Sequence, residues 1–583
     1  MSADAIAADA ATTNWRTYDG GIPANLTVYI VIFPLLMGLI LALPVLACFF
    51  CLGAGKRGKI SQYFPPNRRG GGGGHPEMPN AMKAFLHRYD FNSFPTVLQV
   101  TGLLVVAILS LLVRRRYFSP LSDIPGPFIA SLTRLWHMNR ILKGDQNLKL
   151  IRLHDEHGHF VRVAPDEVSV SHPDALRKIL LTPLRKGDWY KIVHFPDRRF
   201  KNAMGETDPA TKSELSRHLA SGYLLGNLLQ AEAAIDDTVE LLLGWLDRHA
   251  DERRPINLDR FFTYATFDVV GEVIFSKGFG FLREGKDIRG AIANSLVHNQ
   301  YLAVGGYMPW LQVLVSNPFV TWLNVLPFGH ILDTTQGAIE QRKQNPEARF
   351  DAVAHWLRYL EQNPDRMEAS EVQTGALNAV AAGSDTVACG LQAFVYHMIR
   401  RPDLWERVRH EIDGAGLSDP GTRKVVPYAE SQRLLVLQAC IKEALRVFCP
   451  ASMGLSRVAG KGGVTIGDRT FPEGTTLSVS IWVIHHSKEI WGPDASEFRP
   501  ERWLEGDKSS ANEKFYVPFG LGFMSCPGQN IARIELSKIC ATIVRDYDIR
   551  QVNPGQEWQW KAYFNIAPHS WPCYIEKRRQ ASS

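Results

Sequence analysis

Cysteine is scarce in this chain, and so is any large excess of charge of one sign. Eight cysteines occur among 583 residues, and their irregular spacing excludes a disulfide framework of the kind that stabilises small secreted domains. A formal net charge of +6 without a dense basic block gives no reason to expect a nucleic-acid partner. The sequence Gly278-Phe279-Gly280 lacks a preceding buried strand and a glycine-rich continuation, so we expect no nicotinamide or flavin site in the chain itself.

The residues that are present are typical of one large globular domain. Hydrophobic residues make up 45% of the chain and charged residues 21%, which is ordinary for a folded protein. About 460 residues follow Leu121, more than enough to bury a substantial core. Most cysteines lie in apolar surroundings, which favours a reducing compartment facing the cytosol.

Two apolar runs lie near the N-terminus. Residues 26–52 are long enough to span a bilayer, and a glycine-rich linker follows them at 65–74. The second run covers 97–113 and ends in Arg114-Arg115-Arg116. Because basic residues follow both runs, the positive-inside rule cannot place both flanks in the cytosol if each run crosses the membrane fully.

One cysteine near the C-terminus lies between glycines. The segment reads Phe519-Gly520-Leu521-Gly522-Phe523-Met524-Ser525-Cys526-Pro527-Gly528. A thiolate that binds iron must stay deprotonated, and backbone N–H groups in a tight turn, which Gly522 and Gly528 suit, favour the charged form. Phe519 is expected to keep water from the sulfur, and a helix predicted over 530–539 adds its dipole. Cys526 is therefore interpreted as an iron ligand; the alternative is a buried structural thiol.

This loop resembles the cysteine-ligand loop of the cytochrome P450 family, in which Phe, Gly, Cys and Gly recur at the same spacing. The resemblance implies haem b with Cys526 as its axial ligand. Met524 departs from the family pattern, which usually has a basic residue there that pairs with a haem propionate. Arg457 matches a strand position that pairs with propionate in many members, so we expect it to bind the cofactor.

A second departure concerns the helix that normally brings a Trp and an Arg to the propionates. This helix should lie near residues 213–223, where the two family positions fall on Lys212 and Ser216. Both family residues are thus absent from this chain. We expect Arg217 or His218 to substitute for them after a small rotation of the helix.

Residues 375–387, in a long helical pattern, resemble the family's oxygen-activating helix. The resemblance implies catalytic roles for two residues: Thr386 donates a hydrogen bond to dioxygen, and Asp385 passes on protons from water. Ala382-Gly383 would leave room for dioxygen. The residues alone leave open that Thr386 bonds to a carbonyl one turn back and that Asp385 is a solvated charge.

Glu443 and Arg446 are three residues apart on a predicted helix over 437–446, so both charges lie on one face. Apolar flanks favour their burial, and a buried pair needs further hydrogen-bond partners. The alternative is a solvated surface pair. The stretch 498–503 resembles a family loop, which implies that Arg502 completes a structural triad with this pair and holds the proximal side of the haem pocket in shape.

The resemblance covers about residues 121–577 and implies the cytochrome P450 fold, mostly α with a small β region, behind an N-terminal membrane anchor. Residues 117–128 resemble the proline-rich hinge of microsomal members, which assigns the second apolar run as the anchor. The run at 26–52 is then a second span, a re-entrant hairpin or the product of a misplaced start. The predicted division is an N-terminal extension, 1–92; a transmembrane anchor, 93–116; the hinge, 117–128; and the haem-thiolate catalytic domain, 129–583.

Secondary structure follows the same order. The pattern is helix-rich up to about Phe448, and a capping box of Ser370 and Gln373 would open the oxygen-activating helix. Strand signals then gather, with a hairpin over 464–477 and an apolar run at 478–484.

The implied function is a monooxygenase of the endoplasmic reticulum membrane, with its catalytic domain facing the cytosol. Thiolate ligation favours O–O cleavage, and one oxygen atom from O2 is inserted into the substrate. Electrons would come from NADPH through the NADPH-cytochrome P450 reductase. Small or apolar segments at 378–383, 449–455 and 563–566 suggest a lipophilic small molecule such as a terpenoid, polyketide or alkaloid. The tail and hinge look most like fungal microsomal members such as the pisatin demethylase-like group, which favours secondary metabolism.

Two other function classes remain open. A haem-thiolate isomerase or dehydratase would need no reductase, and it often lacks the acid and alcohol found here at Asp385 and Thr386. A non-catalytic membrane scaffold would leave Cys526 idle.

Overall fold

The computed structural model describes most of the chain, in two units. The described residues are 93–194, 196–323, 329–344, 351–417, 424–506 and 512–578. The units, Met1–Leu109 and Ser110–Ser583, meet within the first described helix, α5 (Ser93–Tyr117). The apolar run at 26–52, the glycine-rich linker and the rest of the predicted N-terminal extension lie outside the described residues. No helix in the described part of the chain is long and apolar enough to cross a membrane.

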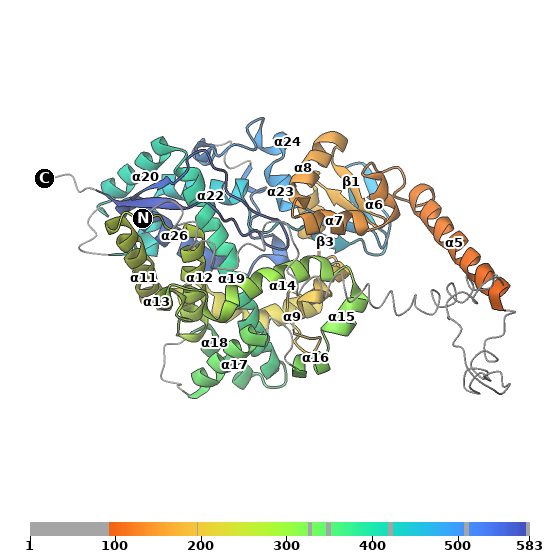
Figure 1. Ribbon diagram of the computed structural model, residues 1–583, viewed down its shortest axis with the longest axis horizontal. Coiled ribbons are helices and arrows are strands. Elements are labelled where there is room, and N and C mark those ends of the chain that lie inside the picture. The colour runs from red at the N-terminus through yellow and green to blue at the C-terminus, as the bar shows by residue number, and fades with distance from the viewer. Residues whose placement is uncertain are drawn as a thin grey trace, which may run out of the picture. The chain divides into compact units, whose positions relative to one another are not determined.

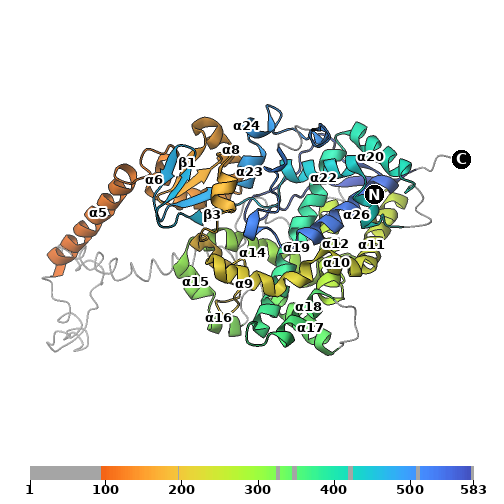
Figure 2. The same cartoon turned by 180° about the vertical axis from the view of Figure 1, so that it is seen from behind.

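Helices dominate the second unit (Figures 1 and 2). They are α6 (Phe128–Leu132), α7 (Leu135–Lys143), α8 (Gln146–His157), α9 (Pro209–Leu219), α10 (Leu225–Leu228), α11 (Glu232–Asp251), α12 (Leu258–Phe275), α13 (Phe281–Glu284), α14 (Ala291–Gly305), α15 (Pro309–Val315), α16 (Pro318–Leu323), α17 (Gly329–Gln344), α18 (Ala352–Gln362), α19 (Ala369–Met398), α20 (Pro402–Gly414), α21 (Tyr428–Ser431), α22 (Leu435–Val447), α23 (Ile481–His485), α24 (Lys488–Trp491) and α26 (Gln529–Asp546). Short 3₁₀ or π turns cover Leu176–Leu180, Asp188–Val193, Ala220–Tyr223, Leu229–Ala231, Ile288–Gly290, Pro500–Trp503 and Gly522–Met524.

The 30-residue helix α19 runs through the helical part of this unit and packs along α12 and against α22 and α26 (Figure 1). Its second half is apolar on nearly all sides and is buried, as expected of a helix surrounded by others. Glu368 and Glu371 form the capping box at its start, so the box predicted at Ser370 and Gln373 is wrong. The Ser370 hydroxyl donates instead to the Glu368 carboxylate, because that carboxylate already holds the N-cap.

Small sheets complete the unit. The largest of those described has the order β1 (Phe160–Ala164), β2 (Glu167–Val170), β6 (Thr476–Val479), β3 (Leu455–Val458). Strands β1 and β2 form an antiparallel pair, β2 runs parallel to β6, and β3 runs antiparallel to β6. The chain is helix-rich up to Phe448 as predicted, but the sequence analysis did not identify strands β1 and β2. These strands are short and fully or nearly fully buried, so they lack the alternating pattern that a half-exposed strand shows.

The later part of the chain follows the prediction more closely. Strands β4 (Val464–Ile466) and β5 (Arg469–Phe471) form the predicted hairpin, whose turn contains Gly467 with a φ of +55°. Strands β7 (Tyr547–Gln551) and β8 (Cys573–Lys577) form a second antiparallel pair. The mostly helical fold with small sheets that the sequence predicts is confirmed.

Candidate functional site

The cysteine loop turns tightly just before α26. The backbone N–H of Cys526 donates to the carbonyl of Phe519 at 2.7 Å, which closes the loop. Gly520 and Gly522 have φ angles of +70° and +66°, a left-handed conformation that favours glycine. A Cβ added at Gly522 would also lie 3.1 Å from the carbonyl oxygen of Leu180. The sequence prediction singled out Gly522 but missed Gly520.

Gly528 contributes in another way. Its φ of −80° is open to any residue, so the turn itself does not require a glycine here. A Cβ at this position would stand 3.9 Å from the Cys526 Sγ. A side chain at this position would therefore contact the sulfur at ordinary van der Waals distance.

Cys526 is the exposed member of the six cysteines in the described residues, and the other five are buried. Although the residue is exposed, protein atoms surround much of its thiol group, and this desolvation raises the pKa of the thiol. The backbone N–H groups of Gly528 and Gln529 oppose that rise by favouring the thiolate. The backbone N–H groups of the loop thus act in the predicted direction, and a bound metal cation would add to the stabilisation of the thiolate.

Asp385 and Thr386 both lie on α19 but have separate partners. The Asp385 carboxylate accepts hydrogen bonds from Ser295 at 2.6 Å and Asn299 at 3.3 Å, both on α14. Burial raises the pKa of this carboxyl, and the two hydrogen bonds counter the rise. The Thr386 hydroxyl donates to the Ala382 carbonyl one turn back, at 2.8 Å. This is the local bond that the sequence left open, so the hydroxyl keeps only its acceptor capacity until it rotates.

The small residues beside Thr386 serve two purposes. Ala382 is exposed although it lies on the central helix, which leaves space next to it. A Cβ at Gly383 would lie 3.0 Å from Val270 of α12. The missing side chain of Gly383 thus permits close packing of α19 on α12, and room for dioxygen at this position stays a prediction.

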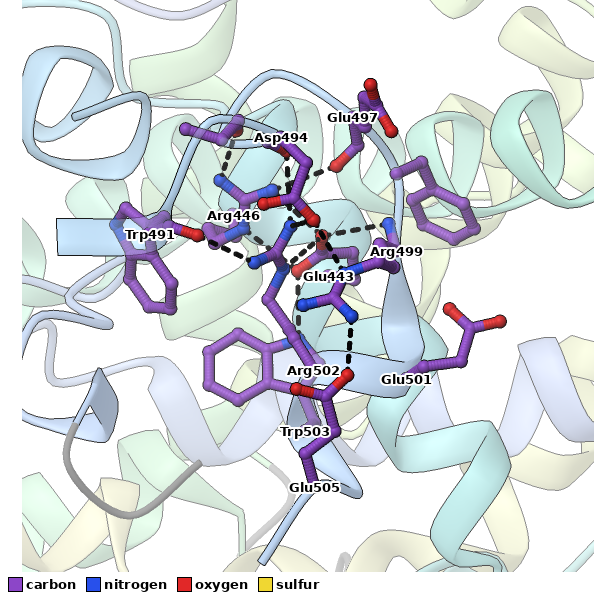
Figure 3. Close-up of polar contacts among 12 residues, drawn as sticks. Glu443, Arg446, Trp491, Asp494, Glu497, Arg499, Glu501, Arg502, Trp503 and Glu505 are labelled. Carbon is purple, nitrogen blue, oxygen red and sulfur yellow. Dashed lines mark hydrogen bonds and ion pairs between the residues drawn. The ribbon is translucent and has the colours of Figure 1, made fainter. Parts of the chain in front are cut away.

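The structure brings Glu443, Arg446 and Arg502 into one buried network (Figure 3). Arg446 donates two hydrogen bonds to the Glu443 carboxylate, at 2.9 and 2.8 Å, and Arg502 donates a third at 2.9 Å. Glu443 and Arg446 are fully buried, and Arg502 is 6% exposed. Burial alone would raise the pKa of Glu443, but the two arginines outweigh it and hold the pKa below its ordinary value.

Backbone carbonyls satisfy the rest of both guanidinium groups. Arg446 donates to the carbonyls of His485, Ala495 and Glu497, and Arg502 donates to those of Trp491 and Asp494. The Trp503 indole N–H donates to Glu443 at 2.9 Å (Figure 3). The network therefore ties α22 to the segment 485–503, which a surface ion pair could not do.

Comparison with known proteins decides the family. The cytochrome P450 family model matches residues 125–562. The chain belongs to the cytochrome P450 family. It is 31% identical to pisatin demethylase of Fusarium vanettenii over 498 residues, covering 83% of this chain and 94% of that protein. It is also 30% identical to a cytochrome P450 monooxygenase of Aspergillus flavus (81% of this chain, 95% of that protein) and 29% identical to the cytochrome P450 monooxygenase gsfF of Penicillium aethiopicum (80% and 97%).

Membership of the cytochrome P450 family implies haem with an axial cysteine, O2 as co-substrate and electrons from a reductase. The described residues fit this cofactor. Cys526 offers an accessible sulfur, and Phe519 lies half-buried in the same loop. Arg457 on β3 is 1% exposed, and its Nε has no hydrogen-bond partner among the described residues. A buried cation with an unused donor suits a haem carboxylate.

On α9, the structure favours a different propionate-binding residue from the two that the sequence predicted. His218 is buried and bonds to Glu371 of α19 at 2.7 Å, so it is already occupied. Arg217 is exposed. Lys212, which the sequence marked only as a departure from the family pattern, is buried and donates to the carbonyl of Phe523 in the cysteine loop. The sequence could have identified Lys212 as a candidate, because a lysine side chain at this family position is long and basic.

Two of the predicted pocket segments meet in space. Residues 449–455 and 563–566 bridge each other at Ala451 and Asn565, and the Ser452 hydroxyl donates to the Tyr563 carbonyl at 2.8 Å. Phe564 stacks on Trp189 with ring centroids 5.6 Å apart. The segment 563–566 therefore makes strand-like bonds and also contributes an aromatic surface beside Trp189.

Proposed function

We propose that this cytochrome P450 is a membrane-bound monooxygenase that inserts one oxygen atom from O2 into a lipophilic small molecule. The observation that carries the proposal is the accessible Cys526 in its glycine-shaped loop, within a chain that the family model matches from 125 to 562. Cys526 is proposed as the axial ligand, and the haem supplies oxygen activation when bound. Electrons are proposed to come from NADPH through the membrane-bound reductase.

The chain's own residues would bind the haem, keep water from the sulfur and supply protons to the oxygen site. Phe519 would keep water from the sulfur, and Arg457 would hold a haem carboxylate. Thr386 would hold a hydrogen bond near the oxygen site, with its hydroxyl released from Ala382. The Asp385 carboxyl, whose pKa is raised by burial, retains a proton to higher pH than an ordinary aspartate, which suits a proton donor.

The substrate class is proposed from the pocket segments and the relatives. The segments that meet around Ala451 and Phe564 present mainly small or aromatic side chains, which favours a lipophilic substrate. A relative named pisatin demethylase and several named fungal cytochrome P450 monooxygenases support a place in fungal secondary metabolism.

The membrane attachment rests on α5. Its described side chains include exposed large hydrophobic residues, among them Leu103 at 70%, Leu104 at 60% and Val106 at 59% exposure. Such a surface favours contact with lipid over water. We place the protein in the endoplasmic reticulum membrane with the catalytic domain facing the cytosol. Retention in yeast microsomes after an alkaline carbonate wash supports this, and release into the supernatant contradicts it.

The carbon monoxide difference spectrum of the dithionite-reduced protein in yeast membranes tests the function. A red-shifted Soret band of the thiolate type is expected, because Cys526 would bind the haem iron as a thiolate. NADPH-dependent product formation with a reductase then distinguishes a monooxygenase from an isomerase. Full-length protein that binds no haem in this way would contradict the proposal.

Replacing Thr386 with alanine is expected to leave the haem spectrum unchanged. The ratio of product formed to NADPH consumed should fall by about ten-fold or more, because the loss of a proton-transfer partner lowers a rate by about 10² to 10⁴. The surplus electrons should appear as hydrogen peroxide. Thr374→Ala is the matched control, since Thr374 lies on the same helix and donates to the carbonyl of Ser370 at 2.7 Å. If both variants form the same amount of product per NADPH consumed, Thr386 has no role in proton delivery.

A further inference from the structure

Three basic side chains are buried close to the cysteine loop. Lys186 and Arg457 are each 1% exposed, and Lys212 is 7% exposed. We call these three residues the cation cluster. They come from three separate parts of the chain: the segment before the turn Asp188–Val193, the helix α9 and the strand β3.

Lys186 and Arg457 lie directly opposite each other. They form an isolated antiparallel bridge, flanked by hydrogen bonds from Gly187 N–H to the Ser456 carbonyl at 3.3 Å and from Val458 N–H to the Arg185 carbonyl at 2.8 Å. Opposite residues of an antiparallel pair project from the same face.

Both side chains also approach one aromatic ring. The Lys186 Nζ lies 4.9 Å from the centre of the Tyr190 ring, and the Arg457 guanidinium lies 5.9 Å from it. The backbone pairing and this shared ring hold the two cations together, although their charges repel.

Lys212 links the cation cluster to the cysteine loop. Its ammonium donates to the carbonyl of Phe523 and lies 5.6 Å from the centre of that residue's ring. Phe523 belongs to the turn Gly522–Met524 and lies three residues before Cys526. The cation cluster therefore lies beside the loop that carries the proposed iron ligand.

The cation cluster lacks a matching anion. No carboxylate among the described residues lies within ion-pair distance of Lys186, Lys212 or Arg457. Glu206 acts on Lys186 from farther away, and its carboxylate accepts the backbone N–H groups of Thr207 and Asp208.

Burial and the like charges of Arg457 and Lys212 lower the pKa of Lys186 to about 6. Burial and Arg457 likewise lower the pKa of Lys212. Buried cations without a counter-charge are costly unless a ligand supplies one.

We propose that the cation cluster binds the two propionate carboxylates of haem, with Lys186 and Lys212 taking the place of the basic residue absent at Met524 and of the pair absent from α9. The proposal rests on the haem-thiolate function stated above. Two carboxylates bring two negative charges to a site that holds three positive ones and one nearby glutamate, so the charges nearly balance. The two lysines are positioning residues, since they would fix the haem and not the reacting atoms.

Haem release from the full-length holoprotein tests the proposal. Transfer of haem to an excess of an apo-globin scavenger is followed by the loss of the thiolate-type Soret band. Lys186→Met and Lys212→Met are each expected to speed this loss by about ten-fold, the effect of one charge-assisted hydrogen bond. Lys191→Met is the matched control. Lys191 is an exposed lysine on the neighbouring turn, paired with Asp188 at 2.7 Å, and its variant should release haem at the wild-type rate.

A second arm tests carboxylate recognition directly. Haem-depleted full-length protein is titrated with haem and with its dimethyl ester, which lacks the carboxylate charges. The wild type is expected to bind the ester at least about ten-fold more weakly, and the methionine variants should lose most of this preference. Lys186→Arg should retain it, because its charge is kept.

The outcomes separate the two proposals. A wild type without the thiolate-type band would overturn the monooxygenase function itself. A normal band together with unchanged haem release in both methionine variants would overturn only the role of the cation cluster. If a methionine variant does not fold, the comparison of haem with its dimethyl ester in the wild type still tests the proposal. Equal affinity of the wild type for the two would contradict carboxylate binding.

Discussion

Replacing Cys526 with alanine is expected to abolish the thiolate-type Soret band of the reduced carbon monoxide complex, and with it all monooxygenase activity. The reason is chemical, because only a thiolate ligand gives this band, and Cys526 is the exposed cysteine among those described. The measurement is the difference spectrum, alongside immunodetection of the full-length chain. Cys449→Ala is the matched control. Cys449 is buried and its sulfur lies 4.0 Å from the Pro518 carbonyl, just before the loop, so the control should keep the band.

If the Cys526→Ala protein retained the band, another cysteine would have to be the iron ligand. A protein that disappeared altogether would point to a fold that depends on haem binding. Cys526→Ser separates these cases. It keeps the size and loop geometry of the residue but supplies no thiolate, so its protein level should approach the wild type while its band is lost.

The second large effect is expected from Glu443→Gln. This change leaves Arg446 and Arg502 buried without their shared counter-charge, and breaking a buried pair typically lowers the free energy of unfolding by about 3–5 kcal/mol. That loss is a large part of the total for a folded domain, about 5–15 kcal/mol, so little haem protein should accumulate. The measurement is urea denaturation followed by the Soret band. Glu501→Gln is the control. Glu501 pairs with Arg401 at 2.9 Å at a partly exposed site, and its loss should cost less than about 1 kcal/mol.

Acid adds an independent check on Glu443. Its folded pKa lies below the ordinary value of 4.5, so its contribution to stability is complete above that pH and is lost as the pH falls through the folded pKa. The wild type should therefore lose stability more steeply than Glu443→Gln on acidification below about pH 4.5. Parallel curves for the two proteins would show that the carboxylate is not the group that titrates.

Short motifs let the sequence predict much of this site. The loop around Cys526 and the pair of Glu443 and Arg446 could be predicted from spacing and side-chain chemistry, and the helix that carries Asp385 and Thr386 from its resemblance to a family motif. The structure places each of them on the expected kind of element. Such motifs are local, so residues a few positions apart carry the information.

The features that the sequence missed depend on distant partners. Lys186 looks like any loop lysine until β3 places Arg457 opposite it. Strand β2 pairs with β6, which lies about 300 residues later in the chain, so no local pattern indicates this pairing. The partner of His218 is Glu371 on α19, which no local pattern indicates. Tertiary pairing decided each of these cases.

The pairing of β2 with β6 also determines when this sheet can form during translation. Glu167 opposes Thr476, so about 300 residues must be translated before this part of the sheet can close, which takes about 15–60 s at about 5–20 residues per second. During that time β2 has an unpaired edge on the emerging chain. Because Cys526 follows still later, the ribosome must translate past residue 526 before the cysteine loop and the sheet can both contact a haem. An unpaired strand edge is prone to aggregation, so chaperones that cover β2 during this interval should raise the yield of folded protein.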